Sequence, residues 1–163
     1  MIRIRNIKPE DCETVVEMIK ELAEFEKLGD QVTAKAGDLY NVVFNEKIAH
    51  CYICEVDGKA AGYLLYYFNV SSFKCRKGVY IEDIYIRPEF RGQNLALGMV
   101  QNLAYQAMEW GCGRMEWMCL DWNTGAKAFY ESFGGKSVED WTLCRIDEKD
   151  FLSVCSCKCH GGH

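Results

Sequence analysis

VYIEDIYIRPEFRGQNLA, residues 79–96, is the stretch that decides the fold of this 163-residue chain. The mostly apolar residues 78–86 are typical of a strand, which Pro88 interrupts. From Leu95 onward apolar residues recur at helical spacing, so a helix begins directly after a short turn. Unpartnered backbone N–H groups and the positive end of the helix dipole meet at such a turn. The pattern therefore predicts a phosphate site between strand and helix.

The segments before this stretch predict strands and helices in turn. Charged and apolar residues alternate at the N-terminus, and Pro9 then opens a run with apolar residues at helical spacing. Period-two alternation on both sides of Asp57-Gly58 indicates two paired strands. The expected elements are a strand at 1–7, a helix at 9–22, a possible helix at 38–44, and a hairpin with strands at 51–56 and 62–68.

The segments after the central stretch continue this alternation. The expected elements are a long helix at 95–107 that ends at Gly111-Cys112-Gly113, a strand at 115–120, a helix at 124–133, and a last strand at 141–146. This order combines an antiparallel meander with two crossover helices. We therefore expect an α+β (mixed α/β) domain, with a central mixed and mostly antiparallel sheet flanked by helices.

The composition indicates one globular domain, with 49% hydrophobic and 26% charged residues. We expect this domain at 1–152 and a disordered Cys/His-containing tail at 153–163. The formal charge of −5 argues against a nucleic-acid partner, which would require clustered Lys and Arg. The apolar runs are shorter than the roughly 18 residues of a membrane span, and 1–7 does not resemble a secretory signal. We therefore expect no membrane partner and a cytoplasmic location.

The ten cysteines fall into two groups. Seven lie in apolar stretches and are expected to be mostly reduced packing residues: Cys12, Cys51, Cys54, Cys75, Cys112, Cys119 and Cys144. The tail holds Cys155, Cys157, Cys159, His160 and His163. These residues could ligate a soft metal, but the C-x-C spacing lacks a second half-site. We expect no metal site, and metal binding by the tail stays open.

The predicted phosphate loop resembles that of a known family. The order Arg91-x-x-Asn94-x-Ala96 after an apolar strand is similar to the R/Q-x-x-G-x-G/A signature with which GNAT acetyltransferases hold the coenzyme A pyrophosphate. Asn94 replaces the middle glycine, and asparagine tolerates a left-handed backbone. The resemblance implies the GNAT fold and acetyl-CoA as co-substrate. It places coenzyme-binding residues at Ile84, Tyr85, Ile86, Arg91, Gly92, Gln93, Asn94, Leu95, Ala96, Leu97, Asn123, Lys127 and Tyr130.

Further windows resemble the diamine acetyltransferase branch of that family. These windows are residues 21–28, 66–68, 80–85 and 120–134, and the similarity covers about residues 3–150. Within the branch, the chain is more similar to thialysine N-epsilon-acetyltransferases than to spermidine/spermine acetyltransferases, because residues 23–28, 83–85 and 120–123 agree with the former. Ser71 also stands where the polyamine enzymes have an aspartate. The resemblance implies a homodimer and a small amine as substrate.

Glu82 and Asp83 are candidates for work on that amine. Neighbouring side chains of a strand point to opposite faces, so the two carboxylates are expected to do different jobs. An alkylammonium, with a pKa of roughly 10, must lose a proton before it attacks a thioester. The resemblance gives the role of base to Glu82. It implies substrate-binding roles for Phe25, Glu26, Glu82, Asp83, Glu139 and Trp141.

The expected mechanism is direct attack in a ternary complex, with Glu82 as water-mediated base. The resemblance makes Tyr130 the general acid, and a backbone N–H near Ile84 or Ile86 is expected to stabilise the oxyanion. Cys119 is expected to pack, with an acetyl-cysteine intermediate as the minor alternative. Three functions stay open: acetyl transfer to a lysine-like amino acid such as thialysine, transfer to a polyamine (spermidine, spermine or a diamine), and a non-catalytic coenzyme A-binding module.

Overall fold

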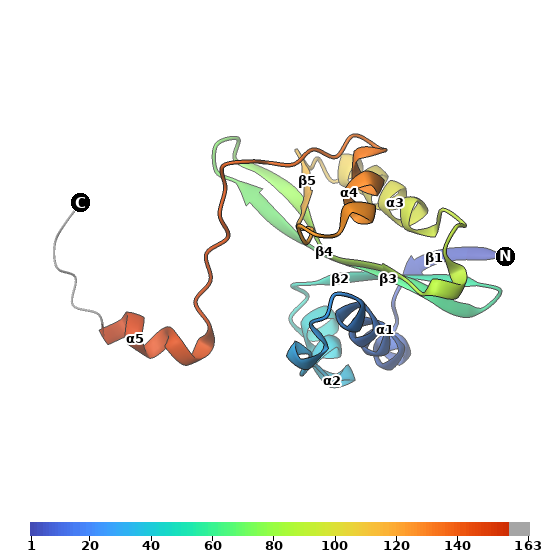
Figure 1. Cartoon of the computed structure of the whole chain (residues 1–163), viewed down its shortest axis with the longest axis horizontal. Coiled ribbons are helices and arrows are strands. Elements are labelled where there is room, and N and C mark those ends of the chain that lie inside the picture. The colour runs from blue at the N-terminus through green and yellow to red at the C-terminus, as the bar shows by residue number, and fades with distance from the viewer. Residues whose placement is uncertain (157–163) are drawn as a thin grey trace. The chain divides into compact units, whose positions relative to one another are not determined.

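The computed structural model describes residues 1–156, and the chain divides into two compact units, Met1–Met118 and the part from Cys119 onward. The first unit is built on a five-stranded sheet in the order β1-β2-β3-β4-β5 (Figure 1). The strands are β1 (Ile2–Asn6), β2 (His50–Val56), β3 (Lys59–Ser71), β4 (Arg76–Ile86) and β5 (Met115–Trp117). Strands β1 to β4 are antiparallel neighbours, whereas β5 is parallel to β4. The prediction of a mixed, mostly antiparallel sheet is confirmed.

Helices cover both faces of this sheet. Helices α1 (Cys12–Phe25) and α2 (Ala36–Tyr40) lie on one face, and α3 (Leu95–Glu109) lies on the other (Figure 1). On the α1 face, Val15 and Met18 pack with Ile53 and Tyr63 of the sheet. The short turns are 3-10 helices at Pro9–Asp11, Gly29–Gln31 and Pro88–Phe90, and a π-helical turn at Asn41–Asn45. No helix of the described part of the chain is long and apolar enough to cross a bilayer.

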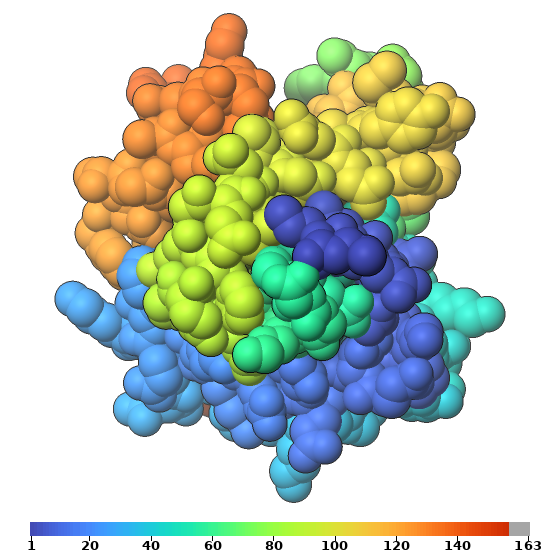
Figure 2. Space-filling model, turned by 90° about the vertical axis from the view of Figure 1, so that its right-hand side faces the viewer, coloured from blue at the N-terminus to red at the C-terminus, as the bar shows by residue number. Residues whose placement is uncertain are grey.

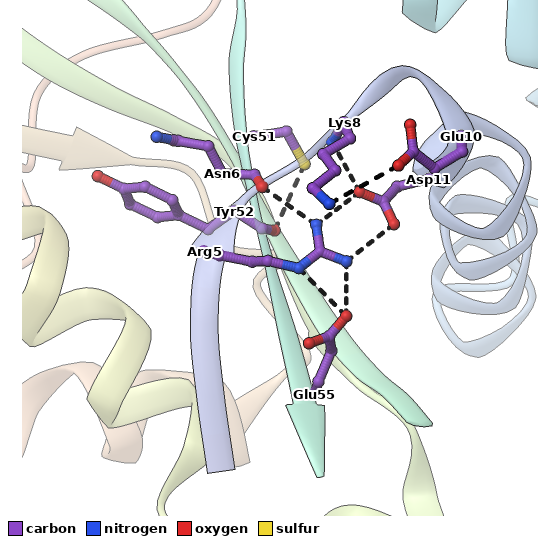
Figure 3. A network of polar contacts seen from close by, with 8 residues as sticks. All are labelled: Arg5, Asn6, Lys8, Glu10, Asp11, Cys51, Tyr52 and Glu55. Atoms are coloured by element: carbon purple, nitrogen blue, oxygen red, sulfur yellow. Dashed lines mark hydrogen bonds and ion pairs between the residues drawn. The ribbon is translucent and has the colours of Figure 1, made fainter. Parts of the chain in front are cut away.

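Arg5 ties the first strand to the start of α1 (Figure 3). Its Nη1 and Nη2 atoms donate to the two carboxylate oxygens of Asp11, at 2.6 and 3.0 Å, and Nη2 also donates to Glu55 Oε1 on β2, at 2.5 Å. The pKa of Asp11 is lowered, chiefly by its hydrogen bond to Arg5. Because all three side chains are largely withdrawn from solvent, this network fixes the position of α1 on the sheet.

The second unit contains helices α4 (Thr124–Glu131) and α5 (Phe151–Ser156), with a 3-10 turn at Glu148–Asp150. The predicted strand at 141–146 is wrong, because these exposed residues have no partner strand within residues 1–156. Strand β5 is also shorter than expected. Residues 153–156, expected in the disordered tail, belong to α5. The remaining tail residues, Cys157, Cys159, His160 and His163 among them, lie outside the described residues.

The cysteines of the described residues are free thiols. Cys12, Cys51 and Cys54 are buried, and Cys112 and Cys119 are half-buried, as expected of packing residues. The expectation that most of the seven pack is met by these five, whereas Cys75 and Cys144 are exposed. Cys75 lies in the turn between β3 and β4, and Cys144 lies in the extended segment without a partner strand, so neither has a core to pack against.

Candidate active site

Strand β4 carries one residue more than its partner at the centre of the sheet. Leu65 of β3 pairs with Asp83, but the next residue, Tyr66, pairs with Ile81. Glu82 is therefore left out of the ladder as the extra residue of a β-bulge. Bulges of this kind redirect side chains, and they are common beside active sites.

The bulge brings the two neighbouring carboxylates to the same face of the sheet. Leu65 and Tyr67 lie two residues apart on β3, so their partners Asp83 and Tyr80 also share a face. Glu82, two residues after Tyr80, follows the same alternation. In agreement, the charge of Glu82 helps to raise the pKa of both Tyr80 and Asp83. The expectation that Glu82 and Asp83 point to opposite faces is wrong, because it assumed an unbroken strand.

Asp83 is half-buried beneath α1 and has one specific hydrogen-bond partner. The hydroxyl of Tyr63 donates to Asp83 Oδ2 at 3.0 Å. The pKa of Asp83 is raised to about 6, chiefly by burial and to a smaller extent by the charges of Glu82 and Glu26, although the bond from Tyr63 lowers it. Asp83 is thus a carboxyl group that titrates close to neutral pH.

Glu26 adds a third carboxylate from the end of α1. It is the C-cap residue of that helix and is half-buried, and burial raises its pKa. Its charge acts on both Asp83 and Tyr63. The structure therefore gathers Glu26, Glu82 and Asp83, three of the six predicted substrate residues, around the bulge of β4. Carboxylates in such an arrangement favour a cationic ligand.

Strands β4 and β5 part at the same bulge. The ladder between them covers only residues 79–81 of β4. Farther along, the N–H of Arg87 donates to the carbonyl oxygen of Ala61 on β3, at 2.9 Å. Because N–H directions alternate along a strand, the N–H groups of Ile86 and Ile84 point away from β3, to the edge that β5 has left. These are the N–H groups expected from the sequence to stabilise the oxyanion.

The loop between β4 and α3 has the geometry of an anion site. Asn94, the N-cap residue of α3, adopts a left-handed backbone with φ 57° and ψ 22°, and Gly92 has φ 79°. The inference that Asn94 can serve where the family signature has glycine is thus supported by its conformation. The first helical bond joins the Gly98 N–H to the Asn94 carbonyl. The N–H groups of the first helical turn, 95–97, precede this bond and have no partner inside the helix, so they are available to a phosphate.

Arg91 fastens this loop to two other elements. Its Nε atom donates to the carbonyl oxygen of Ile86 on β4 at 3.1 Å, and its guanidinium lies 5.4 Å from the ring centroid of Phe25 at the end of α1. The loop lies at the surface, where Figure 2 shows it in yellow-green. A cation and several N–H groups therefore face solvent together, an arrangement that suits the pyrophosphate of coenzyme A.

Two supporting residues were not found from the sequence. Tyr63 holds Asp83, and Arg87 anchors the end of β4 to α1 by donating to both carboxylate oxygens of Glu21, with an Nη2–Oε1 distance of 2.8 Å. Tyr63 lies within the strand expected at 62–68 and Arg87 directly after the one expected at 78–86, positions where tyrosine and arginine are unremarkable. Tyr63 is a diagonal neighbour of Asp83 across the regular part of the β3–β4 ladder, and only the register between the two strands reveals this.

The remaining predicted site residues belong to the second unit. Asn123 is the N-cap of α4, where its Oδ1 accepts from the Ala126 N–H at 3.1 Å. Lys127 donates to the Asp121 carbonyl at 2.9 Å. Tyr130 lies beside the rings of Phe129 and Phe133, with centroids 5.4 and 6.1 Å away. Glu139 and Trp141 are exposed and lie outside any helix or strand.

Comparisons with known proteins agree with this geometry. Residues 14–135 match the acetyltransferase (GNAT) family. The chain is 35% identical over 158 residues to thialysine N-epsilon-acetyltransferase of Bos taurus, an alignment that covers 90% of this chain and 92% of the relative. It is 29% identical over 163 residues to spermidine/spermine N(1)-acetyltransferase-like protein 1 of Homo sapiens, covering 93% of this chain and 23% of that protein.

A solved structure shows the same fold. A predicted acetyltransferase with acetyl-CoA from Clostridium acetobutylicum superposes with a TM-score of 0.75 at 17% identity, covering 89% of this chain and 96% of that one. Enzymes of the matched family use acetyl-CoA as co-substrate, and the loop N–H groups, Arg91 and the parted strands fit its pyrophosphate and acyl arm. The chain belongs to the GNAT family of acetyltransferases and is an acetyl-CoA-dependent enzyme.

Proposed function

We propose that this acetyltransferase acts on the amine of a small cationic metabolite, and that the preferred acceptor is the ε-amine of thialysine or a related lysine-like amino acid. The observation that carries the proposal is the group of three carboxylates, Glu26, Glu82 and Asp83, beside the open edge of β4. A site with this charge attracts an alkylammonium. The identity to the Bos taurus enzyme over nearly the whole chain supports the choice of acceptor.

In the proposed reaction, the bound ammonium first loses a proton through water to the exposed carboxylate of Glu82. The neutral amine then attacks the thioester carbonyl of acetyl-CoA, forming the C–N bond. The N–H groups of Ile84 or Ile86 stabilise the negative oxygen of the tetrahedral intermediate. Its collapse breaks the C–S bond, and Tyr130 donates the proton that the departing thiolate takes up. The nitrogen releases its extra proton, and this proton restores the Tyr130 hydroxyl. The role of Tyr130 rests on the family resemblance.

A polyamine is the alternative acceptor. It is supported by the similarity to the human spermidine/spermine N(1)-acetyltransferase-like protein, and three carboxylates also suit a polycation. Ser71, at the end of β3, supplies no charge at a position where polyamine enzymes of the branch have an aspartate. The third possibility, a non-catalytic coenzyme A-binding module, is disfavoured, because Asn94 keeps the left-handed conformation of the loop.

A substrate panel tests the proposal. Thialysine, lysine, putrescine, spermidine, spermine and a lysine-bearing peptide are each incubated with acetyl-CoA, and released coenzyme A is measured. We expect the highest kcat/KM with thialysine, and a loss of roughly 100-fold or more in the Glu82→Gln variant. A preference for spermidine or spermine would establish the alternative. Release with none of the amines, from protein that binds coenzyme A, would contradict acetyl transfer to a small amine.

Two features of the proposal rest on the resemblance and on the sequence. The assembly into a homodimer is taken from the family resemblance, and the cytoplasmic location stays a prediction. The single domain expected at 1–152 likewise stays a prediction. The family match at 14–135 spans the boundary between the two compact units, which supports it.

A further inference from the structure

Tyr63 is a wholly buried tyrosine whose hydroxyl reaches the candidate site from below. Its side chain has no solvent exposure and packs on the α1 face with Val15, Met18 and Ile53. These neighbours offer no hydrogen-bond acceptor from their side chains. A buried hydroxyl needs a partner, and Tyr63 finds it in Asp83 Oδ2 at 3.0 Å. Packing therefore fixes the orientation of the Tyr63 ring, and this orientation fixes the position of the hydroxyl that donates to Asp83.

We propose that Tyr63 is a positioning residue that holds the Asp83 carboxylate in its ionised form and in one orientation, so that Asp83 receives the ammonium group of the acceptor amine. This inference rests on the proposed transfer to an amine. It divides the work between the two neighbouring carboxylates: Asp83 binds the cation, and the exposed Glu82 remains available as the base.

Of the groups considered around Asp83, Tyr63 is the one that favours the negative charge of this carboxylate. Glu82 faces it from the same strand, and Glu26 faces it from the end of α1; both repel a negative charge. Cys51 of β2 is a buried thiol whose pKa is raised, chiefly by burial and in part by the charge of Asp83. It therefore stays neutral and carries no positive charge that would favour an ionised Asp83. Burial also disfavours the ionised form. Among these neighbours, Tyr63 alone stabilises the carboxylate.

The consequence is a defined pH dependence. An ionised Asp83 attracts an ammonium group, and a protonated Asp83 does not, so amine binding declines as the pH falls through the pKa of Asp83. Removing the Tyr63 hydroxyl takes away the interaction that lowers this pKa. The acidic limb of kcat/KM must then move to higher pH. A residue that only fills space in the core would leave this limb in place.

The test compares Tyr63→Phe with the wild-type enzyme across the acidic pH range, using the best amine of the panel. We expect the acidic limb of kcat/KM to move up by roughly 0.5–1 pH unit, and KM for the amine near pH 6.5 to rise about three- to tenfold. We expect kcat at saturating amine and the Kd for coenzyme A to change little. The matched control is Tyr52→Phe, which removes the hydroxyl of another buried tyrosine on β2. An unmoved acidic limb in Tyr63→Phe would overturn the proposal.

Two measurements keep the test decisive. If Tyr63→Phe does not fold, Asp83→Asn replaces it; an acidic limb that persists unchanged in this variant would also overturn the inference. Independently of any substrate, carboxyl ¹³C NMR can follow the titration of Asp83 in the free enzyme. A pKa that is the same in wild type and Tyr63→Phe contradicts the role of Tyr63. Failure of every amine in the panel, with a shifted Asp83 pKa, would instead contradict the proposed function alone.

Discussion

The guanidinium of Arg91 lies over the ring of Phe25, 5.4 Å from its centroid. This contact links the end of α1 to the phosphate loop, although Phe25 was selected from the sequence as a substrate residue. An exposed cation–π contact contributes about 0.5–1 kcal/mol. It also keeps Arg91 close to Ile86, to which the same side chain donates a hydrogen bond.

Replacing Phe25 by Ala should therefore weaken coenzyme A binding by about two- to fivefold, as measured by calorimetry. Phe73→Ala is the control, because Phe73 is almost fully exposed in the turn between β3 and β4. If the Kd for coenzyme A stays unchanged while KM for the amine rises, Phe25 serves the acceptor, and its contact with Arg91 is incidental.

Asn94 provides a test of the loop conformation. Its left-handed backbone suits glycine and asparagine but not a β-branched residue, for which the cost is about 1–2 kcal/mol. Asn94→Val should lower the free energy of unfolding by this amount and weaken coenzyme A binding, whereas Asn94→Gly should bind coenzyme A as the wild type does. Denaturant unfolding and calorimetry check both effects. Equal behaviour of the two variants would show that the loop does not depend on this conformation.

Asp83 should make the stability of the fold depend on pH in an unusual direction. Its pKa is raised from the ordinary 3.8 to about 6, mainly by burial. The neutral carboxyl group therefore contributes stability that is fully present below the unfolded pKa and is lost as the pH rises through about 6. Asp83→Asn cannot ionise and should gain stability over the wild type across this interval.

The expected gain between about pH 4 and about pH 7.5 is on the order of 2 kcal/mol. The measurement is the difference in the free energy of unfolding between Asp83→Asn and wild type at the two pH values. Because all other carboxylates are common to both proteins, their contributions largely cancel. A difference that does not change with pH would mean that burial does not raise the pKa of Asp83.

Tyr130→Phe tests the proposed general acid. Loss of the hydroxyl should lower kcat by roughly 100-fold, with little change in the Kd for coenzyme A, because a general acid acts mainly in the transition state. Tyr105→Phe is the matched control, since Tyr105 is an exposed tyrosine on α3. Undiminished turnover would remove Tyr130 from the mechanism.

The sequence predicted those strands, helices and loops that depend on local residue patterns. The strand, loop and helix around Arg91 follow from periodicity and from punctuation by Pro88 and Gly92, and the structure forms them as expected. The bulge at Glu82 escaped prediction because it arises from the register between β3 and β4, which neither strand encodes alone. Alternating apolar residues also suggested a strand at 141–146, but such a pattern cannot supply a partner strand.

The bulge determines what would follow if β4 lost a residue at this position. If Glu82 is skipped, the residues on either side still alternate regularly: Ile81 faces α3 and Asp83 faces α1. A chain shortened by this single residue would keep every later side chain of β4 on its present face, together with the contact between Asp83 and Tyr63. The proposed base therefore behaves as an insertion into a strand that is complete without it. The acid–base chemistry and the burial pattern are encoded separately, in residues that stand next to each other.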